Sequence, residues 1–219
     1  GQEYEKLLRQ VIEKKVGVEE LFKSIENRGA ISSQIGFLTM LLMLLGSMLY
    51  KFYYQDKKGT DKRILCGDIS YKQYILSHIL VVFAILFIPT ICICILANAL
   101  FHLNMFVSIL EITFIIFTLC LLSTSFSFFI ASITKTEENG SLLATMVIVI
   151  TSLISGSIME VSKQGLTQKL AHLFPQRYII DFTIHVERGE VGSYINMWTI
   201  IFISIGLLII GGIVNKKRI

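Results

Sequence analysis

The sequence contains little charge and little proline. Only 16% of its 219 residues are Asp, Glu, Lys or Arg, and two are proline, whereas 53% are hydrophobic. Such a composition excludes an ordinary water-soluble domain and is typical of a polytopic membrane protein. Membrane-spanning strands would require apolar residues at every second position and closure into a barrel, and the sequence shows no such pattern. It therefore predicts an all-α chain.

Motifs for catalysis and for nucleotide binding are also missing. The chain has no phosphate-binding Gly-x-x-x-x-Gly-Lys-Ser/Thr and no zinc-binding His-Glu-x-x-His, so we expect neither ATP hydrolysis nor catalysis by this chain alone. The pair Glu137-Glu138 is similar to the start of some intramembrane proteases, but no arginine follows at the required spacing. Negative charge at the start of a helix explains the pair better. Nothing in the sequence predicts a nucleic-acid partner.

Cysteine is scarce, and its spacing does not suggest a metal site. The four cysteines are Cys66, Cys92, Cys94 and Cys120. No two of them have the separation found in zinc fingers, and at least three fall within predicted spans. We therefore expect no metal, no cofactor and no disulfide in this chain.

The hydrophobic residues gather in long runs. A helix needs roughly 20 apolar residues to cross a bilayer, and five stretches meet or approach that length. We predict membrane spans at residues 34–50, 74–100, 105–133, 141–160 and 194–214. Pro89 lies within the second span and removes a backbone donor there, which predicts a kink.

Residues 1–33 are charged and amphipathic, with two short helical patterns separated by Gly17. The six basic residues of this segment are matched by six glutamates, as in a small folded region. We predict that it is an external helical segment that follows a missing first span. The intact protein would then have six spans and residues 34–219 would form its transmembrane domain.

A basic segment at residues 51–72 separates the first two visible spans. Together with Lys135 and the basic C-terminus, its six Lys and Arg residues predict that these parts face the cytoplasm, held against the bilayer surface. Thr60 can cap a short helix that Gly67 ends, and Ser70 has the capping-box spacing to Gln73. The segment thus reads as a small helix between two spans, at a surface that a soluble partner can reach.

Residues 161–193, between the fourth and fifth spans, are too apolar for a simple loop. An apolar periodicity runs from Leu166 to Phe174, is interrupted by Pro175 and is followed by a second short apolar piece. We predict two short re-entrant or interfacial helices on the outer side. Gly156, just before this region, can let a helix bend or approach a neighbour closely.

Polar residues within the spans are mostly Ser and Thr. They can line a polar path for a substrate, but ordinary packing between membrane helices uses the same residues, and packing is the default interpretation. Glu111 is the only acid well inside a predicted span, and a position near the outer surface explains it better than a substrate role. The candidate path residues are Ser123, Thr124, Ser127, Thr151, Ser155 and Glu111.

From Ile35 to the C-terminus, the order of these features resembles the permease subunit of ABC-2 type ABC transporters. Three motifs carry the resemblance: the basic stretch that begins Gly59-Thr60, Ser155-Gly156 late in the penultimate span, and Pro175-Gln-Arg-Tyr178 before the last span. In that family the basic stretch is a cytoplasmic coupling helix. The resemblance therefore implies ATPase-coupling roles for Gly59, Thr60, Asp61, Lys62, Arg63, Ile64, Leu65 and Ser70.

The resemblance implies a multi-pass permease in a bacterial cell membrane. It would pair with a second permease subunit, as a homodimer or heterodimer, and with separate ABC ATPase subunits that bind ATP and Mg. The family exports many kinds of cargo, and the apolar spans favour a hydrophobic or amphipathic one, such as an antimicrobial peptide, a drug or a lipid. The alternative is a membrane protein that does not transport, such as an immunity or sensor protein or an intramembrane protease.

Overall fold

A computed structural model describes residues 30–59, 70–101, 109–157, 170–187 and 194–216. These residues are almost entirely helical and contain no strand, which confirms the all-α prediction. The predicted external segment lies outside them except for its last four residues, which belong to the first described helix. The helices of this part of the chain are α2 (Ala30–Leu49), α3 (Lys51–Gly59), α5 (Tyr71–Phe101), α6 (Ile109–Ile133), α7 (Glu137–Ile154), α9 (Pro175–Glu187) and α10 (Tyr194–Lys216).

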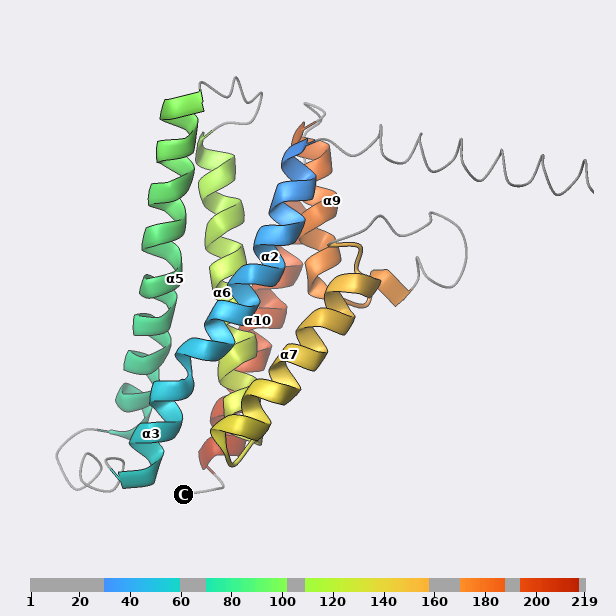
Figure 1. Cartoon of the computed structure of the whole chain (residues 1–219). Coiled ribbons are helices and arrows are strands. Elements are labelled where there is room, and N and C mark those ends of the chain that lie inside the picture. Colours follow the sequence, from blue (N-terminus) through green and yellow to red (C-terminus); the bar gives the residue numbers. More distant parts are fainter. Residues whose placement is uncertain (1–29, 60–69, 102–108, 158–169, 188–193, 217–219) are drawn as a thin grey trace, which may run out of the picture.

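Five of these helices are long and apolar enough to cross a membrane, which confirms the five visible spans. α2, α5, α6, α7 and α10 run alternately up and down the bundle (Figure 1). α3, the turn between α6 and α7 and the end of α10 therefore lie together at one end, which we call the α3 end. The basic residues Lys51 and Lys135 belong to this end.

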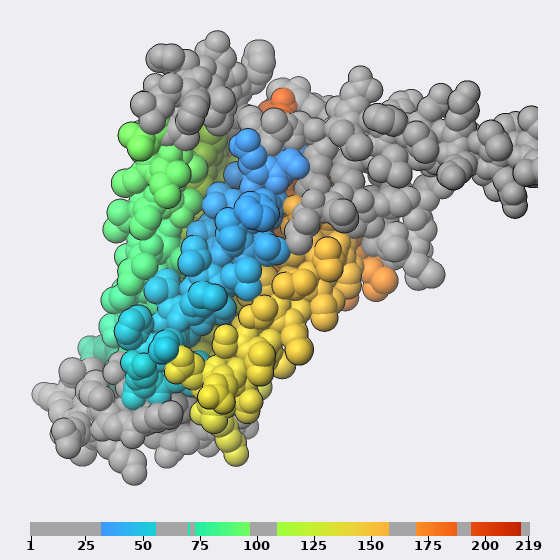
Figure 2. Space-filling view, in the orientation of Figure 1, coloured from blue at the N-terminus to red at the C-terminus, as the bar shows by residue number. Residues whose placement is uncertain are grey.

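α6 is the central helix, because α2, α5, α7 and α10 all pack against it. Most of its residues are buried, including Leu119, Leu122 and Phe128, which are at most 1% exposed. Figure 2 shows α2 between α5 and α7 on one face of the molecule. The core is thus a set of helices arranged around α6.

α7 has well-defined ends. Thr136 is its N-cap and accepts a hydrogen bond from the Asn139 amide, and Glu137 and Glu138 occupy the first turn. Their helix-start role is therefore confirmed. At the other end Gly156 has a positive φ of 79°. There the Ser157 amide donates to the Ser152 carbonyl at 3.0 Å, and the Gly156 amide donates to the Leu153 carbonyl at 3.3 Å. This is a Schellman motif, and it ends α7 before the predicted limit of residue 160.

α5 continues as one helix through Pro89 (Figure 1). The proline ring deprives the Ile85 carbonyl of its usual amide partner. The hydroxyl of the next residue, Thr90, donates to the carbonyl of Leu86, one turn earlier in the helix, at 2.7 Å. Pro89 itself is exposed on the outside of the bundle, and α5 continues past it. The kink at this residue stays a prediction.

α9 is the described part of the region between the last two spans. Pro175 begins this helix, as suits a residue that lacks an amide hydrogen and has a preset φ. α9 packs against both α2 and α10, and its inner face buries Ile179, Phe182 and Thr183. The first of the two predicted helices, from Leu166 to Phe174, lies outside the described residues up to residue 169, and within its described part only Leu170 and Ala171 are helical. α9 itself is therefore packed into the bundle.

Candidate functional site

The predicted coupling segment lies between α3 and α5. Gly59 ends α3 and Ser70 precedes α5, whereas Thr60 to Leu65 lie outside the described residues, so their role stays a prediction. The capping box is confirmed. The Ser70 amide donates to Gln73 Oε1 at 3.0 Å, and the Gln73 amide donates to Ser70 Oγ at 3.4 Å. This pair fixes the residue at which the segment enters α5.

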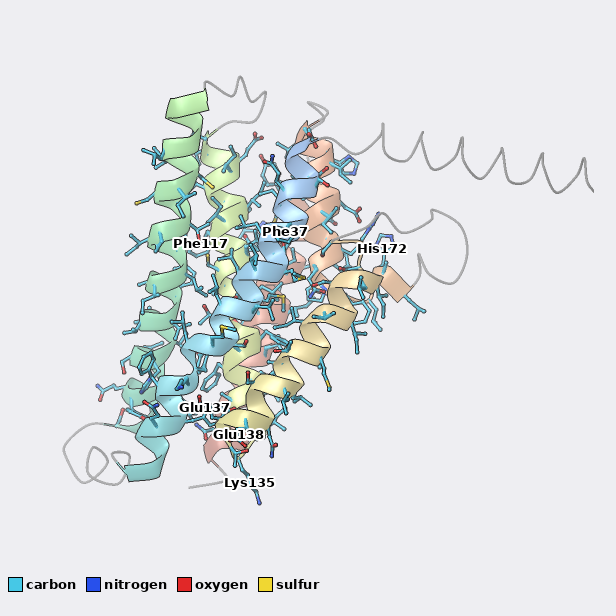
Figure 3. All side chains as sticks on the ribbon, viewed as in Figure 1. Phe37, Phe117, Lys135, Glu137, Glu138 and His172 are labelled. Carbon is cyan, nitrogen blue, oxygen red and sulfur yellow. The ribbon has the colours of Figure 1, made fainter. Side chains whose placement is uncertain are left out.

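α3 is joined to three other helices by side chains. Lys51 Nζ lies 3.3 Å from Glu137 Oε1 at the start of α7. The Asn215 side-chain amide, near the end of α10, donates to the Tyr53 hydroxyl. The Tyr54 hydroxyl bonds to the hydroxyl of Thr134, just after α6. Figure 3 shows the neighbouring residues Lys135, Glu137 and Glu138 at this end.

An aromatic cluster fills the space behind these bonds. Tyr50 and Tyr53 are 1% and 2% exposed. The Tyr53 ring meets His78 of α5 edge to face, with centroids 5.5 Å apart, and Phe128 of α6 at 6.3 Å. Tyr74 meets the same histidine at 4.8 Å. Each such pair contributes about 0.5–1.5 kcal/mol beyond burial, so the cluster holds the α3 end firmly.

A mainly apolar groove of about 220 Å³ lies beside this cluster, between α5 and the junction of α2 with α3. Two polar residues, Ser77 and His78, contribute to its wall. The whole lining consists of Leu49, Phe52, Ser77, His78, Val81, Val82 and Ile85. The groove suits an apolar group more than a charged one.

Two of the candidate path residues on α6, Ser123 and Ser127, face α2 at close range. A Cβ atom built on Gly46 would lie 2.5 Å from Ser123 Oγ and 2.9 Å from Ser127 Oγ. Because Gly46 has no side chain, the Ser123 hydroxyl reaches the Leu42 carbonyl of α2 and donates to it. Thr124 donates back to the Cys120 carbonyl of its own helix at 2.8 Å. These contacts are those of two closely packed membrane helices.

A second polar contact joins α2, α7 and α9 through Gln176. This residue is 2% exposed. Its Nε2 donates to Thr151 Oγ1 at 2.9 Å and lies 3.3 Å from Met43 Sδ, whereas its Oε1 is buried without a hydrogen-bond partner. Thr151 is thus brought into a cluster, and Ser155 follows it at the end of α7. The Pro-x-x-Tyr motif was visible in the sequence, whereas the role of the glutamine within it was not predicted.

The arginine of the same motif forms an ion pair along α9. Arg177 Nη2 lies 3.0 Å from Asp181 Oδ1, and Arg177 Nε donates to Asp181 Oδ2 at 3.2 Å. His172 Nδ1 is 3.9 Å from the same carboxylate, and Figure 3 places His172 near the end of α7. Both charged groups are about one-fifth exposed. The bidentate pairing lets two charges sit partly buried beside the bundle.

Glu111 lies in the first turn of α6, at the opposite end from α3. The position is partly exposed and agrees with a site near a membrane surface, where a carboxylate costs less than at mid-depth. The structure does not bring Glu111 together with the serines of α6 that face Gly46. The six path residues therefore lie in three places, and their substrate role stays a prediction.

Among the described residues, no group of three His, Cys, Asp or Glu side chains can hold a metal ion. A function can therefore rest on five candidate spans, on a basic segment between two of them, and on the Ser-Gly and Pro-x-x-Tyr motifs, the second of which contains Gln176. The family model described as "ABC-2 family transporter protein" matches residues 3–214. The chain belongs to the ABC-2 transporter family. It is the permease subunit that the sequence resemblance indicated.

This family comprises the membrane components of transporters, which are generally not catalytic and which associate with ABC ATPase subunits. The permease is accordingly a multi-pass membrane protein. No curated protein matches its sequence.

Proposed function

We propose that the permease exports a hydrophobic or amphipathic substrate, such as an antimicrobial peptide, a drug or a lipid, out of the cell. Two permease subunits, identical or related, form the membrane path. Separate ATPase subunits supply the energy and bind the segment at residues 56–70, which faces the cytoplasm together with the C-terminus.

The position of the basic segment supports the ATPase contact. It leaves α3 and enters α5 at a residue fixed by the Ser70 capping box. Lys51 and Lys135 lie at the α3 end, where α10 ends at Lys216. A cluster of positive charge at one end of a bundle favours the cytoplasmic side of a membrane. An ATPase that binds there pushes on α5 directly.

The interior supports an uncharged or amphipathic substrate. Among the described residues, the buried polar side chains are Ser, Thr, Gln, Asn and Tyr, and none of them carries a charge. A carrier of ions or strongly charged solutes usually places acids or bases deep within its spans. The mainly apolar groove beside α5 gives such a substrate a place to enter from the membrane.

Purification with the ATPase subunit tests the coupling role. We expect Arg63→Glu, which reverses a charge in the predicted coupling stretch, to reduce recovery of the ATPase and to lower its hydrolysis rate in the complex. Lys135→Glu is the matched control, because it makes the same change in net charge at the same end but in the exposed turn between α6 and α7. Unchanged ATPase recovery and hydrolysis with Arg63→Glu would contradict the coupling role.

Transport in liposomes tests the substrate class. The permease and ATPase subunits are reconstituted together, and ATP-dependent movement is measured for a cationic amphipathic peptide, a neutral hydrophobic dye, a fluorescent phospholipid and a potassium-sensitive reporter. We expect movement of at least one of the first three. ATP-dependent movement of potassium alone would show that the proposed substrate class is wrong.

A further inference from the structure

α3 has a property that its position between two spans does not require. Although it is a short charged helix that ends in the basic segment, Tyr50, Tyr53 and Tyr54 at its start are at most 6% exposed. The neighbouring Lys51 and Phe52 point outward and are exposed. The buried tyrosines direct α3 toward the ends of the other helices.

The hydroxyl of Tyr54 meets two of these helix ends at once. Thr134 Oγ1 donates its own proton to the Ile130 carbonyl at 2.8 Å, so in its bond with Tyr54 the threonine accepts and the tyrosine donates. A Cβ atom on Gly140, in the first turns of α7, would collide with the same tyrosine hydroxyl. Tyr54 therefore fits against the end of α6 and the start of α7 together.

Tyr53 makes the corresponding contact with α10. Asn215 is 1% exposed and lies 162 residues away in the sequence, yet its side-chain amide donates to the Tyr53 hydroxyl. The tyrosine ring also touches His78 of α5 and Phe128 of α6. One side chain of α3 thus contacts three other membrane helices.

We propose that α3 distributes the ATP-driven displacement of the predicted coupling segment, which follows it in the chain, to α6, α7 and α10, with Tyr53 and Tyr54 as the positioning residues. This inference rests on the proposed ATPase coupling. Direct connection through α5 moves only one helix, which lies at the edge of the bundle. The contacts of the two tyrosine hydroxyls connect the displacement to the central helix α6 and to α7 and α10, which both pack against it. A buried, hydrogen-bonded side chain transmits a shift that a flexible exposed side chain would not.

Hydrogen exchange measured by mass spectrometry on the full permease–ATPase complex tests this inference without knowledge of the substrate. In the unsubstituted complex, we expect Mg-ATP to change exchange in peptides around residues 60–80, 130–140 and 208–216. With Tyr53→Phe and Tyr54→Phe combined, both rings remain and both hydroxyls are lost. We then expect the change to persist at 60–80 and to be lost at 130–140 and 208–216, while ATPase recovery stays unchanged.

Tyr194→Phe is the matched control, because Tyr194 begins α10 at the opposite end from Asn215 and is half exposed. It should leave the whole pattern intact. Should the double variant fold poorly, Asn215→Leu removes the α10 contact from the other side, and it should abolish the change at 208–216 while that at 130–140 remains.

The outcomes separate this inference from the proposed function. If the ATPase does not bind the unsubstituted permease, both are overturned. If the ATPase binds and Mg-ATP changes exchange at all three places equally in the unsubstituted protein and in the tyrosine and Asn215 variants, the distributing role of α3 is wrong and the coupling role stands.

Discussion

α5 and α6 lie side by side, and each is long and apolar enough to cross a membrane. In α6, 72% of the most apolar stretch is buried inside the bundle, whereas in α5 only 17% is. α5 exposes large side chains such as Leu80 and Ile88. α6 buries small polar ones, including Ser123, Thr124 and Ser127.

The difference shows that hydrophobicity does not measure burial in a membrane. Lipid chains are as apolar as leucine, so exposing a branched aliphatic face to lipid has no hydrophobic cost. Tight contact between helices needs small residues, such as Gly46 opposite Ser123. α6 is therefore the packed centre of the permease, and α5 is a peripheral helix. The following substitutions test this contrast.

The largest effect is expected at Gly46. Gly46→Leu would force a side chain against Ser123 and Ser127 and displace α2 from α6. We expect a loss of about 3 kcal/mol in the free energy of unfolding, measured by denaturation in mixed detergent micelles. The control is Gly206→Leu in α10, because a Cβ atom there meets nothing within 4 Å. If both variants were equally stable, close packing of α2 on α6 would be unimportant.

A cavity in α6 should cost less. Leu119→Ala removes a side chain that is 1% exposed, and we expect a loss of about 2 kcal/mol in the same assay, at the lower end of the usual range because no transfer from water is involved. Leu80→Ala makes the same chemical change on α5, where the side chain is 57% exposed, and should change stability little. Equal losses for the two would remove the distinction between centre and periphery.

A smaller effect is expected for the contact between α7 and α9. Thr151→Val removes the acceptor of the Gln176 amide, and interhelical hydrogen bonds in membranes contribute about 0.6 kcal/mol on average. Thr199→Val, which removes an exposed hydroxyl bonded only within α10, is the control. A stability of Thr151→Val equal to that of the control would show that this bond adds nothing to the bundle.

The smallest effect is expected for the ion pair between Lys51 and Glu137. Its side chains are 55% and 35% exposed, so water screens the attraction and Glu137→Gln should cost about 0.3 kcal/mol at low salt and less at high salt. Glu138→Gln alters the same helix start without touching the pair. A larger loss for Glu138→Gln would assign the effect to the helix dipole.

Much of this architecture could be predicted from the sequence because membrane helices are long and locally determined. The apolar runs indicated all five spans, and the Ser70–Gln73 spacing correctly predicted a capping box. The role of Glu137 and Glu138 at the start of α7 followed from charge alone. These features depend on residues that lie near one another in the sequence.

Features that depend on distant residues could not be predicted in this way. Nothing near Asn215 in the sequence points to Tyr53, and Gln176 shows its importance only when α2, α7 and α9 are assembled. Pro175 was predicted to end the preceding apolar piece, and helical structure does stop before it, at Ala171. Its second role, as the first residue of α9, was not predicted, because it depends on the packing of the residues that follow.

The early end of α7 at Gly156 also affects the lipid around the permease. α7 has 18 residues and α5 has 31, which correspond to roughly 27 Å and 46 Å of helix. The hydrocarbon core of a bilayer is about 30 Å thick, so α5 extends beyond it and α7 falls short. We therefore expect a bilayer of uneven thickness, thinned beside α7, so that the lipid composition of the membrane influences how this permease sits in it.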